Sequence, residues 1–159
     1  SALRDQVLSS WDKDGRPDFA KGDRLVMSFH GLPKRNLMKG DPYHCECLKT
    51  GRLLGESLGL EPGQYLVTFQ SRFGKAEWLK PYTAPMIEEL GKAGCKRVDI
   101  LCPGFPADCL ETLEEIAMEA NHQFKVHGGE EFLAIPCMND DDEWCGVVAN
   151  WIEDFKQSK

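Results

Sequence analysis

The sequence lacks several features that would indicate particular classes of protein. It has no run that approaches the roughly 20 apolar residues of a membrane-spanning helix, and no basic-then-apolar leader opens the chain. Basic residues number 19 against 26 acidic ones, for a net charge of −7, so the basic face that a nucleic-acid partner needs is not expected. Neither GxGxxG nor GxxxxGK(S/T) occurs, so no motif predicts nucleotide binding. These absences favour a soluble cytoplasmic protein.

Cysteine is present, but in a pattern that excludes most of its structural uses. The seven cysteines are an odd number without secretory context, which favours reduced thiols over a disulfide framework. No CxxC pair occurs, and Cys45 and Cys47 would point about 200° apart on a helix. A structural zinc site or an iron–sulfur cluster is therefore not expected, and the roles of the individual thiols stay open.

Alternating apolar segments predict a single α/β domain over residues 1–159. Each predicted strand is a short apolar run, and each predicted helix has apolar residues at helical spacing. The strands are expected over 25–29, 64–70, 97–102 and 132–137, and the helices over 2–12, 41–60, 84–94, 108–124 and 141–155. Asp108 is the expected N-cap of its helix. Four successive βα units predict a four-stranded parallel sheet flanked by helices on both faces, which is a Rossmann-like fold.

A histidine ends the first predicted strand. His30 follows the apolar run in "SFHGLP", and Gly31 and Pro33 come directly after it. Ligands of open parallel sheets bind outside the carboxyl ends of the strands. A neutral imidazole at that edge can accept a proton or ligate Fe(II) or Zn(II), while the alternative is a histidine satisfied by a backbone group. Both interpretations stay open on position alone.

A row of carboxylates lies on the helix that follows the third predicted strand. Glu111, Glu115 and Glu119 are spaced four residues apart, and Leu110 and Leu113 are expected on the opposite, core-facing side. A solvated charged face explains such a row, and it is the favoured interpretation for Glu119. Glu111 differs because it lies in the first turn, beside the expected crevice. There a carboxylate and the imidazole could share a cation or exchange protons.

Aromatic side chains occur in the same loops. Tyr43, Phe73, Trp78 and Phe105 all lie between a predicted strand and the next helix or inside its first turn. A flat apolar ligand would need ring surfaces of this kind, although aromatic residues are more often part of an ordinary core. From spacing alone, a ligand-binding role is the less common outcome.

Three segments together resemble ferrochelatase. They are "SFHGLP…GDPY", "FQSRFG…WLKPYT" and "PGFPADCLETLEEI", and the likeness extends over residues 23–139, most closely to the C-terminal half of bacterial members. The resemblance implies a lyase of haem biosynthesis that inserts Fe(II) into protoporphyrin IX without an organic cofactor. It further implies that His30 and Glu111 face each other across the porphyrin cleft as metal ligands and proton acceptors. By the same resemblance Glu115 joins the metal site, and Tyr43, Trp78 and Phe105 line the porphyrin pocket.

The resemblance also sets expectations for partners. Ferrochelatases are built from two α/β halves, so the N-terminal half of the same enzyme is the expected partner and the isolated chain is expected to be a fragment that need not turn over alone. No 2Fe-2S cluster is expected, because no C-terminal cysteine group is present. Residues 31–40 are a candidate for peripheral contact with a membrane. The alternatives are a metal- or tetrapyrrole-binding module without catalysis, and a cobalt chelatase of the same fold that acts on sirohydrochlorin.

Overall fold

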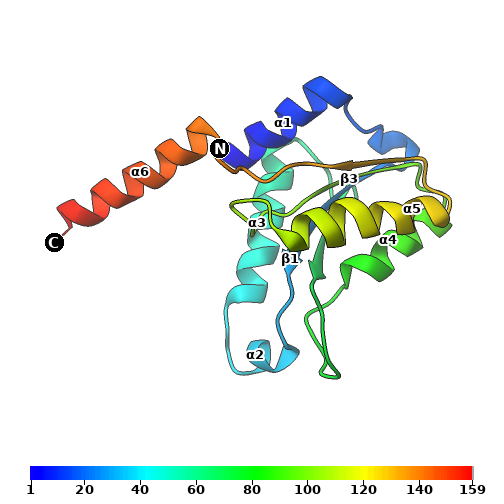
Figure 1. The fold of residues 1–159 in the computed structure, drawn as a ribbon, viewed down its shortest axis with the longest axis horizontal. Coiled ribbons are helices and arrows are strands. Elements are labelled where there is room, and N and C mark those ends of the chain that lie inside the picture. Colours follow the sequence, from blue (N-terminus) through cyan, green and yellow to red (C-terminus); the bar gives the residue numbers. More distant parts are fainter. Residues whose placement is uncertain (159) are drawn as a thin grey trace.

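Four parallel strands form the centre of the structure, a computed structural model that describes residues 1–158 (Figure 1). The strands lie in the order β2-β1-β3-β4, and each neighbouring pair is parallel. They are β1 (Arg24–His30), β2 (Tyr65–Gln70), β3 (Arg97–Leu101) and β4 (Glu131–Ala134). The predicted α/β class with a four-stranded parallel sheet is confirmed.

The central strand β1 is mostly apolar because both faces of the sheet are covered, and its one internal polar residue, Ser28, is buried as well. Leu25, Val26 and Met27 are completely buried, as is typical of strands inside a parallel sheet. β1 pairs with β2 in a register that places His30 opposite Gln70, where both strands end. The carboxyl ends of β1 and β2 therefore bring these two residues to one edge of the sheet.

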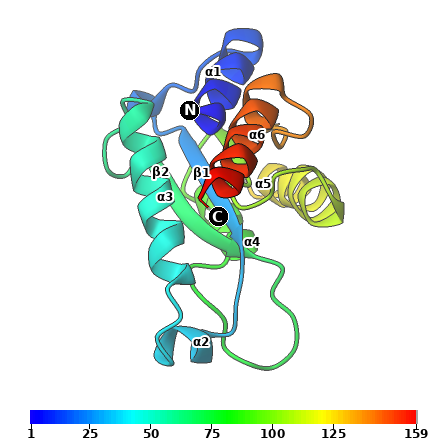
Figure 2. The ribbon, with the colours of Figure 1, turned by 90° about the vertical axis from the view of Figure 1, so that its left-hand side faces the viewer.

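Helices cover both faces of the sheet (Figure 2). One face packs against α1 (Ala2–Asp14) and α3 (Tyr43–Ser57), and the other against α4 (Thr83–Lys92), the π-helix η2 (Glu111–Ala120) and α5 (Asn121–Val126). Two short elements, η1 (Phe19–Lys21) and α2 (Lys34–Met38), lie in the connections. Successive residues of β1 point to opposite faces, so Val26 and Met27 belong to two separate apolar cores.

The helix predicted over 108–124 is two helices in the structure. It runs first as the π-helix η2, whose backbone bonds join residues five apart, and then as α5. Asp108 is not the N-cap, because Leu110 occupies that position and no side chain caps the helix. The Asp108 carboxylate instead accepts hydrogen bonds from the Asn139 amide at 2.7 Å and the Thr112 hydroxyl at 3.0 Å. Asp108 therefore ties the loop after β3 to the loop after β4.

The fourth strand is shorter than predicted. β4 ends at Ala134 rather than at Cys137. Ile135 still donates one backbone bond, to the Ile100 carbonyl at 2.8 Å. Pro136 then has no N–H for the ladder, so regular pairing with β3 stops there.

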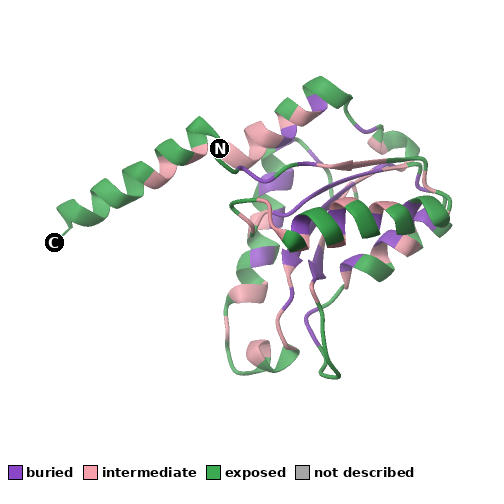
Figure 3. Ribbon diagram, viewed as in Figure 1, coloured by how far each residue is buried: buried purple, intermediate pink, exposed green. Residues whose placement is uncertain are grey.

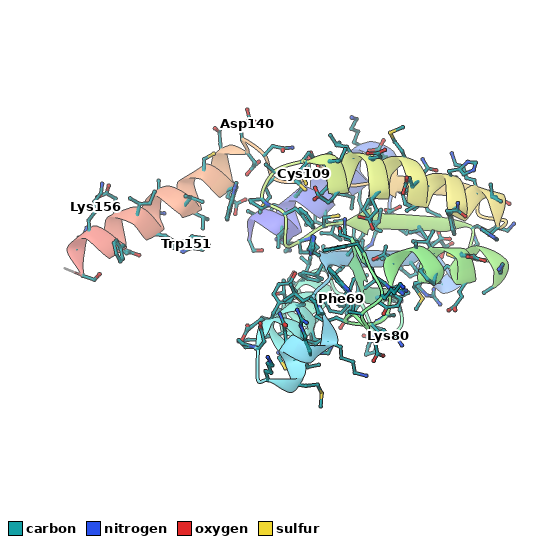
Figure 4. All side chains as sticks on the ribbon, turned by 60° about the horizontal axis from the view of Figure 1, so that its bottom comes forward. Phe69, Lys80, Cys109, Asp140, Trp151 and Lys156 are labelled. Carbon is teal, nitrogen blue, oxygen red and sulfur yellow. The ribbon has the colours of Figure 1, made fainter. Side chains whose placement is uncertain are left out.

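The last helix, α6 (Asp142–Gln157), projects from the body of the fold (Figures 1 and 3). It begins at a true N-cap, since the Asp141 carboxylate accepts from the Trp144 amide at 2.9 Å. None of its residues is buried, and Trp151 is 60% exposed. Figure 4 shows Trp151 and Lys156 far from the sheet. α6 is therefore not one of the helices that cover the sheet. Among residues 1–158, no helix is long and apolar enough to cross a bilayer.

Candidate active site

His30 is partly buried at the carboxyl end of β1, and its protonation pattern follows from one contact. The Nδ1 atom lies 2.7 Å from the backbone oxygen of Gly31. A carbonyl oxygen can only accept a hydrogen bond, so Nδ1 must carry the hydrogen. The lone pair of a neutral imidazole is then on Nε2. His30 can therefore present Nε2 as a metal ligand or a proton acceptor.

Aromatic side chains surround His30. The ring centroid of His30 lies 6.4 Å from that of Trp78 and 6.3 Å from that of Phe105. The Tyr43 hydroxyl donates to the backbone oxygen of His30 at 2.8 Å, and Phe73 covers Trp78 in an edge-on contact at 5.2 Å. The structure thus gathers around one imidazole the three aromatic residues predicted for the porphyrin pocket.

Tyr43 remains a hydrogen-bond donor at physiological pH. Burial raises the pKa of its phenol well above the ordinary value, and the neighbouring Cys47 thiol acts in the same direction. The backbone of His30 is consequently held by a neutral hydroxyl rather than repelled by a phenolate. Tyr43 fixes the end of β1, and its ring is the part that remains available to a ligand.

Glu111 is the first residue of η2, close enough to His30 for their charges to interact. Its own backbone amide, the thiol of Cys109 and the imidazole of His30 all lower the pKa of the Glu111 carboxyl. The carboxylate is therefore ionised at neutral pH. Figure 4 places Cys109 at the start of η2. The structure brings together the imidazole and the carboxylate that the sequence singled out.

Glu115 is held by the loop that follows β2. Its carboxylate accepts from the Ser71 amide at 2.7 Å and from the Ser71 hydroxyl at 2.9 Å, one bond on each oxygen. Each oxygen keeps a further lone pair. Glu115 and Glu119 border a groove of about 620 Å³ between η2 and the start of α4. Glu119 is exposed, as the interpretation of a solvated face predicted.

The prediction that Leu110 and Leu113 face the core, on the side of the helix away from the carboxylates, is wrong. Leu110 and Leu113 are 69% and 54% exposed, whereas Ile116 is buried in the core. Within residues 1–158 these two side chains are only partly covered. They form an apolar rim next to Glu111.

Residues 1–158 contain no cluster of three or more His, Cys, Asp or Glu side chains arranged to hold a metal ion. All seven cysteines are free. Burial raises the pKa of the Cys137 thiol to about 12 and that of Cys102 still further.

Sequence reasoning missed the polar residues that support the site. Gln70 is 2% exposed, and its amide donates to the backbone oxygen of Glu111 at 2.9 Å. Ser28, Thr68 and Thr83 are also buried and connect to it through hydrogen bonds. The signal in the sequence was a polar residue at the end of an apolar strand, which is costly to bury without partners.

Comparison with known proteins agrees with this geometry. The family model of ferrochelatase matches residues 1–155. A curated ferrochelatase of Janthinobacterium sp. (strain Marseille) is 60% identical over 152 residues, which are 96% of this chain and 40% of that relative. The chain thus spans well under half the length of that relative. The match covers the body of the fold and every candidate site residue, so this chain belongs to the ferrochelatase family.

Proposed function

We propose that this chain forms the metal-site half of an enzyme that inserts Fe(II) into protoporphyrin IX to make protohaem. One observation carries the proposal: an imidazole whose Nδ1 is held by a backbone oxygen, leaving Nε2 for a ligand, lies within electrostatic range of an ionised carboxylate and beside the rings of Trp78 and Phe105. Metal insertion needs a base for the pyrrole protons and ligands that replace the water of the metal. No organic cofactor and no 2Fe-2S cluster take part in this proposal.

His30 and Glu111 are the proposed catalytic residues. Glu111 interacts electrostatically with His30, and an imidazole and a carboxylate together can accept a proton from a pyrrole nitrogen and hold the incoming metal. Glu115 lies one turn further along η2, and its remaining lone pairs make it a proposed third metal contact. Fe(II) is a borderline cation that accepts both imidazole and carboxylate ligands. The donor set therefore fits the metal.

Tyr43, Trp78 and Phe105 are the proposed porphyrin contacts. Trp78 is 5% exposed, so it can meet a macrocycle only along one edge or after Phe73 moves from its face. Phe105 is partly buried on the other side of His30. A macrocycle between them would present its nitrogens to the imidazole.

The remaining polypeptide of the full-length protein is the proposed partner. The chain covers 40% of its curated relative, and Trp151 and Ile152 on α6 are 60% and 51% exposed. Apolar side chains in this position are usually covered in the complete protein. We propose that the N-terminal half of the same enzyme packs against α6 and closes the porphyrin cleft.

A cytoplasmic enzyme that touches the inner membrane only at its surface fits the apolar edge of the site. Met38 and Phe73 are each 76% exposed, and both lie in loops that follow β1 and β2. Lys34, Arg35 and Lys39 lie next to Met38 and would face anionic headgroups. The proposed contact is peripheral.

The test compares metal insertion with its alternatives. The full-length protein and the 159-residue chain are each incubated anaerobically with Fe(II) and protoporphyrin IX, and separately with Co(II) and sirohydrochlorin, while the absorption spectrum is followed. Insertion of Fe(II) by the full-length protein supports the proposal. Preference for sirohydrochlorin would indicate a cobalt chelatase. Binding of the tetrapyrrole or metal without insertion by either protein would indicate a binding module.

A further inference from the structure

Two consecutive residues at the end of β2 hold the π-helix η2 at two points. The side-chain amide of Gln70 donates to the backbone oxygen of Glu111 at 2.9 Å. The amide and hydroxyl of Ser71 donate to the carboxylate of Glu115 at 2.7 and 2.9 Å. The two contact points are four residues apart on η2. The helix is thereby fixed in both position and rotation against the edge of the sheet.

The side chain of Gln70 is itself fixed in one orientation. Its carbonyl oxygen accepts from the Ser28 hydroxyl at 2.8 Å and from the Cys102 thiol at 3.4 Å. The Ser28 hydroxyl also pairs with Thr83, which donates to Thr68 at 2.9 Å. All of these groups are buried, so each unmade bond would leave a polar atom without water. The amide nitrogen of Gln70 must therefore point to Glu111.

Ser71 adopts an unusual backbone conformation to make its contacts. Its φ angle is 62°, in the left-handed region that residues other than glycine rarely enter. Such conformations persist where surrounding contacts fix them, and they occur often at functional sites. Here the conformation directs both the amide and the hydroxyl of one residue at one carboxylate.

The register of the sheet connects this arrangement to His30. His30 and Gln70 are paired neighbours at the ends of β1 and β2, and Ser28 lies on the same face as His30 two residues earlier. The chain of contacts therefore runs from the strand that carries the imidazole, through Gln70, to the residue that carries the carboxylate. A π-helix is a rare geometry, and this one begins at Glu111.

We infer that Gln70 and Ser71 are positioning residues that hold Glu111 at a fixed distance from His30 for the handling of the metal. This inference rests on the proposed function. Neither residue has to touch the metal or the porphyrin. The amide of Gln70 sets where η2 starts, and Ser71 sets how η2 is rotated.

The experiment compares Gln70→Met, which keeps length and volume but removes all three hydrogen bonds of the side-chain amide, with Gln64→Met as matched control. Gln64 lies one residue before β2 at its other end, where its side chain accepts only from the Glu61 amide. A second variant, Ser71→Ala, removes one of the two bonds to Glu115 and leaves the buried core intact. Circular dichroism verifies that each protein is folded at the assay temperature.

Two readouts separate positioning from general damage. In the full-length protein, Zn(II) insertion into a soluble porphyrin gives kcat and the KM of each substrate. In the 159-residue chain, absorption titration gives the affinity for Co(II) without turnover. We expect kcat/KM for the metal to fall at least tenfold in Gln70→Met and about threefold in Ser71→Ala. Co(II) affinity should fall in parallel, while the KM for porphyrin stays within twofold.

The outcomes distinguish this inference from the proposed function. Suppose that the wild type is active and that Gln70→Met and Ser71→Ala have the same kcat/KM for the metal as Gln64→Met. That result overturns the positioning role but leaves the proposed function standing. A loss that appears equally in the KM for porphyrin overturns it too, because a merely structural defect would do the same. A wild-type protein that inserts no metal contradicts the proposed function, and Co(II) affinity then decides the positioning role. The inference is overturned if Gln70→Met binds Co(II) with the affinity of the wild type. It is also overturned if the unaltered chain does not bind Co(II).

Discussion

At the scale of single residues, burial decides which thiols can react. Cys102 and Cys137 are buried beside η2, and burial raises both thiol pKa values, that of Cys137 to about 12. The reactive thiolate is therefore scarce at neutral pH. We expect a short pulse of iodoacetamide at pH 7.5 to label the exposed Cys45 and Cys145 and to spare Cys102 and Cys137. Peptide mass spectrometry measures this, and labelling of Cys102 as fast as Cys45 would contradict the burial argument.

The ionisation of Asp108 should make the stability of the fold depend on pH in the acid range. Burial opposes its ionisation, but hydrogen bonds from Asn139, Cys137 and Thr112 outweigh that effect and leave the pKa of Asp108 below its ordinary value. The unfolded chain then binds a proton more readily than the folded chain does. Stability from this group is present above the unfolded pKa of about 4 and is lost as the pH falls through the lower folded value.

The corresponding measurement is urea unfolding between pH 7 and pH 3. Asp108→Asn should cost about 1 kcal/mol at pH 7, because hydrogen bonds to a partly buried charged acceptor are weakened. The difference from the wild type should shrink as the pH falls towards 3. Asp140→Asn, in the exposed part of the next loop, is the control and should follow the wild type. A difference that stays constant with pH would show that the charge of Asp108 does not matter.

At the scale of elements, α3 lies so close to β2 that the helix has glycine, and no side chain, at the point of contact. A Cβ atom on Gly51 would lie 2.3 Å from the Cγ2 atom of Val67, a stiff branched side chain. We expect Gly51→Ala to destabilise the fold by about 1–3 kcal/mol through overpacking, even though alanine favours a helix by about 1 kcal/mol. Gly146→Ala on α6, where nothing lies within 4 Å, should cost nothing. Urea unfolding followed by circular dichroism compares them, and equal effects would contradict the packing argument.

The elements also show how far sequence patterns extend. β1 and β3 were predictable because strands buried on both faces are rich in apolar residues, even though Ser28 and Asp99 lie inside them. The π-helical form of η2 was not, because "ETLEEIAMEA" has the periodicity of an α-helix and only tertiary contacts with Gln70 and Ser71 fix its register. Likewise, apolar spacing predicted the helix α6 but not that none of its residues would be buried in the described part of the chain.

The site was predictable to a similar extent. His30, Glu111, Tyr43, Trp78 and Phe105 stand in recognisable segments. The structure places Tyr43, Trp78 and Phe105 beside His30, and Glu111 within electrostatic range of it, and the roles of these residues stay predictions. The supporting network could not be read from the sequence. A buried glutamine needs partners, but nothing in the sequence says that Gln70 finds them on a strand and a helix that are distant along the chain.

At the scale of the whole molecule, the exposed side chains of α6 predict where the rest of the enzyme packs. Trp151 is 60% exposed, so Trp151→Ala should change the stability of the 159-residue chain by less than about 0.5 kcal/mol. In the full-length protein the same substitution should cost about 3–5 kcal/mol, because a tryptophan buried at an interface between halves is lost. Thermal or urea unfolding of both proteins gives the comparison. A small effect in both would show that α6 stays uncovered.

The central claim is that the His30 imidazole handles the metal. The most direct measurement is anaerobic Fe(II) insertion into protoporphyrin IX by the full-length protein, with His30→Ala against His122→Ala, an exposed histidine on α5 as control. His30→Ala removes a proton acceptor that is also a proposed metal ligand, so we expect its rate of Fe(II) insertion to be at least about 100-fold below that of the wild type. His122→Ala should insert Fe(II) at close to the wild-type rate. Insertion by His30→Ala at the wild-type rate would contradict the account.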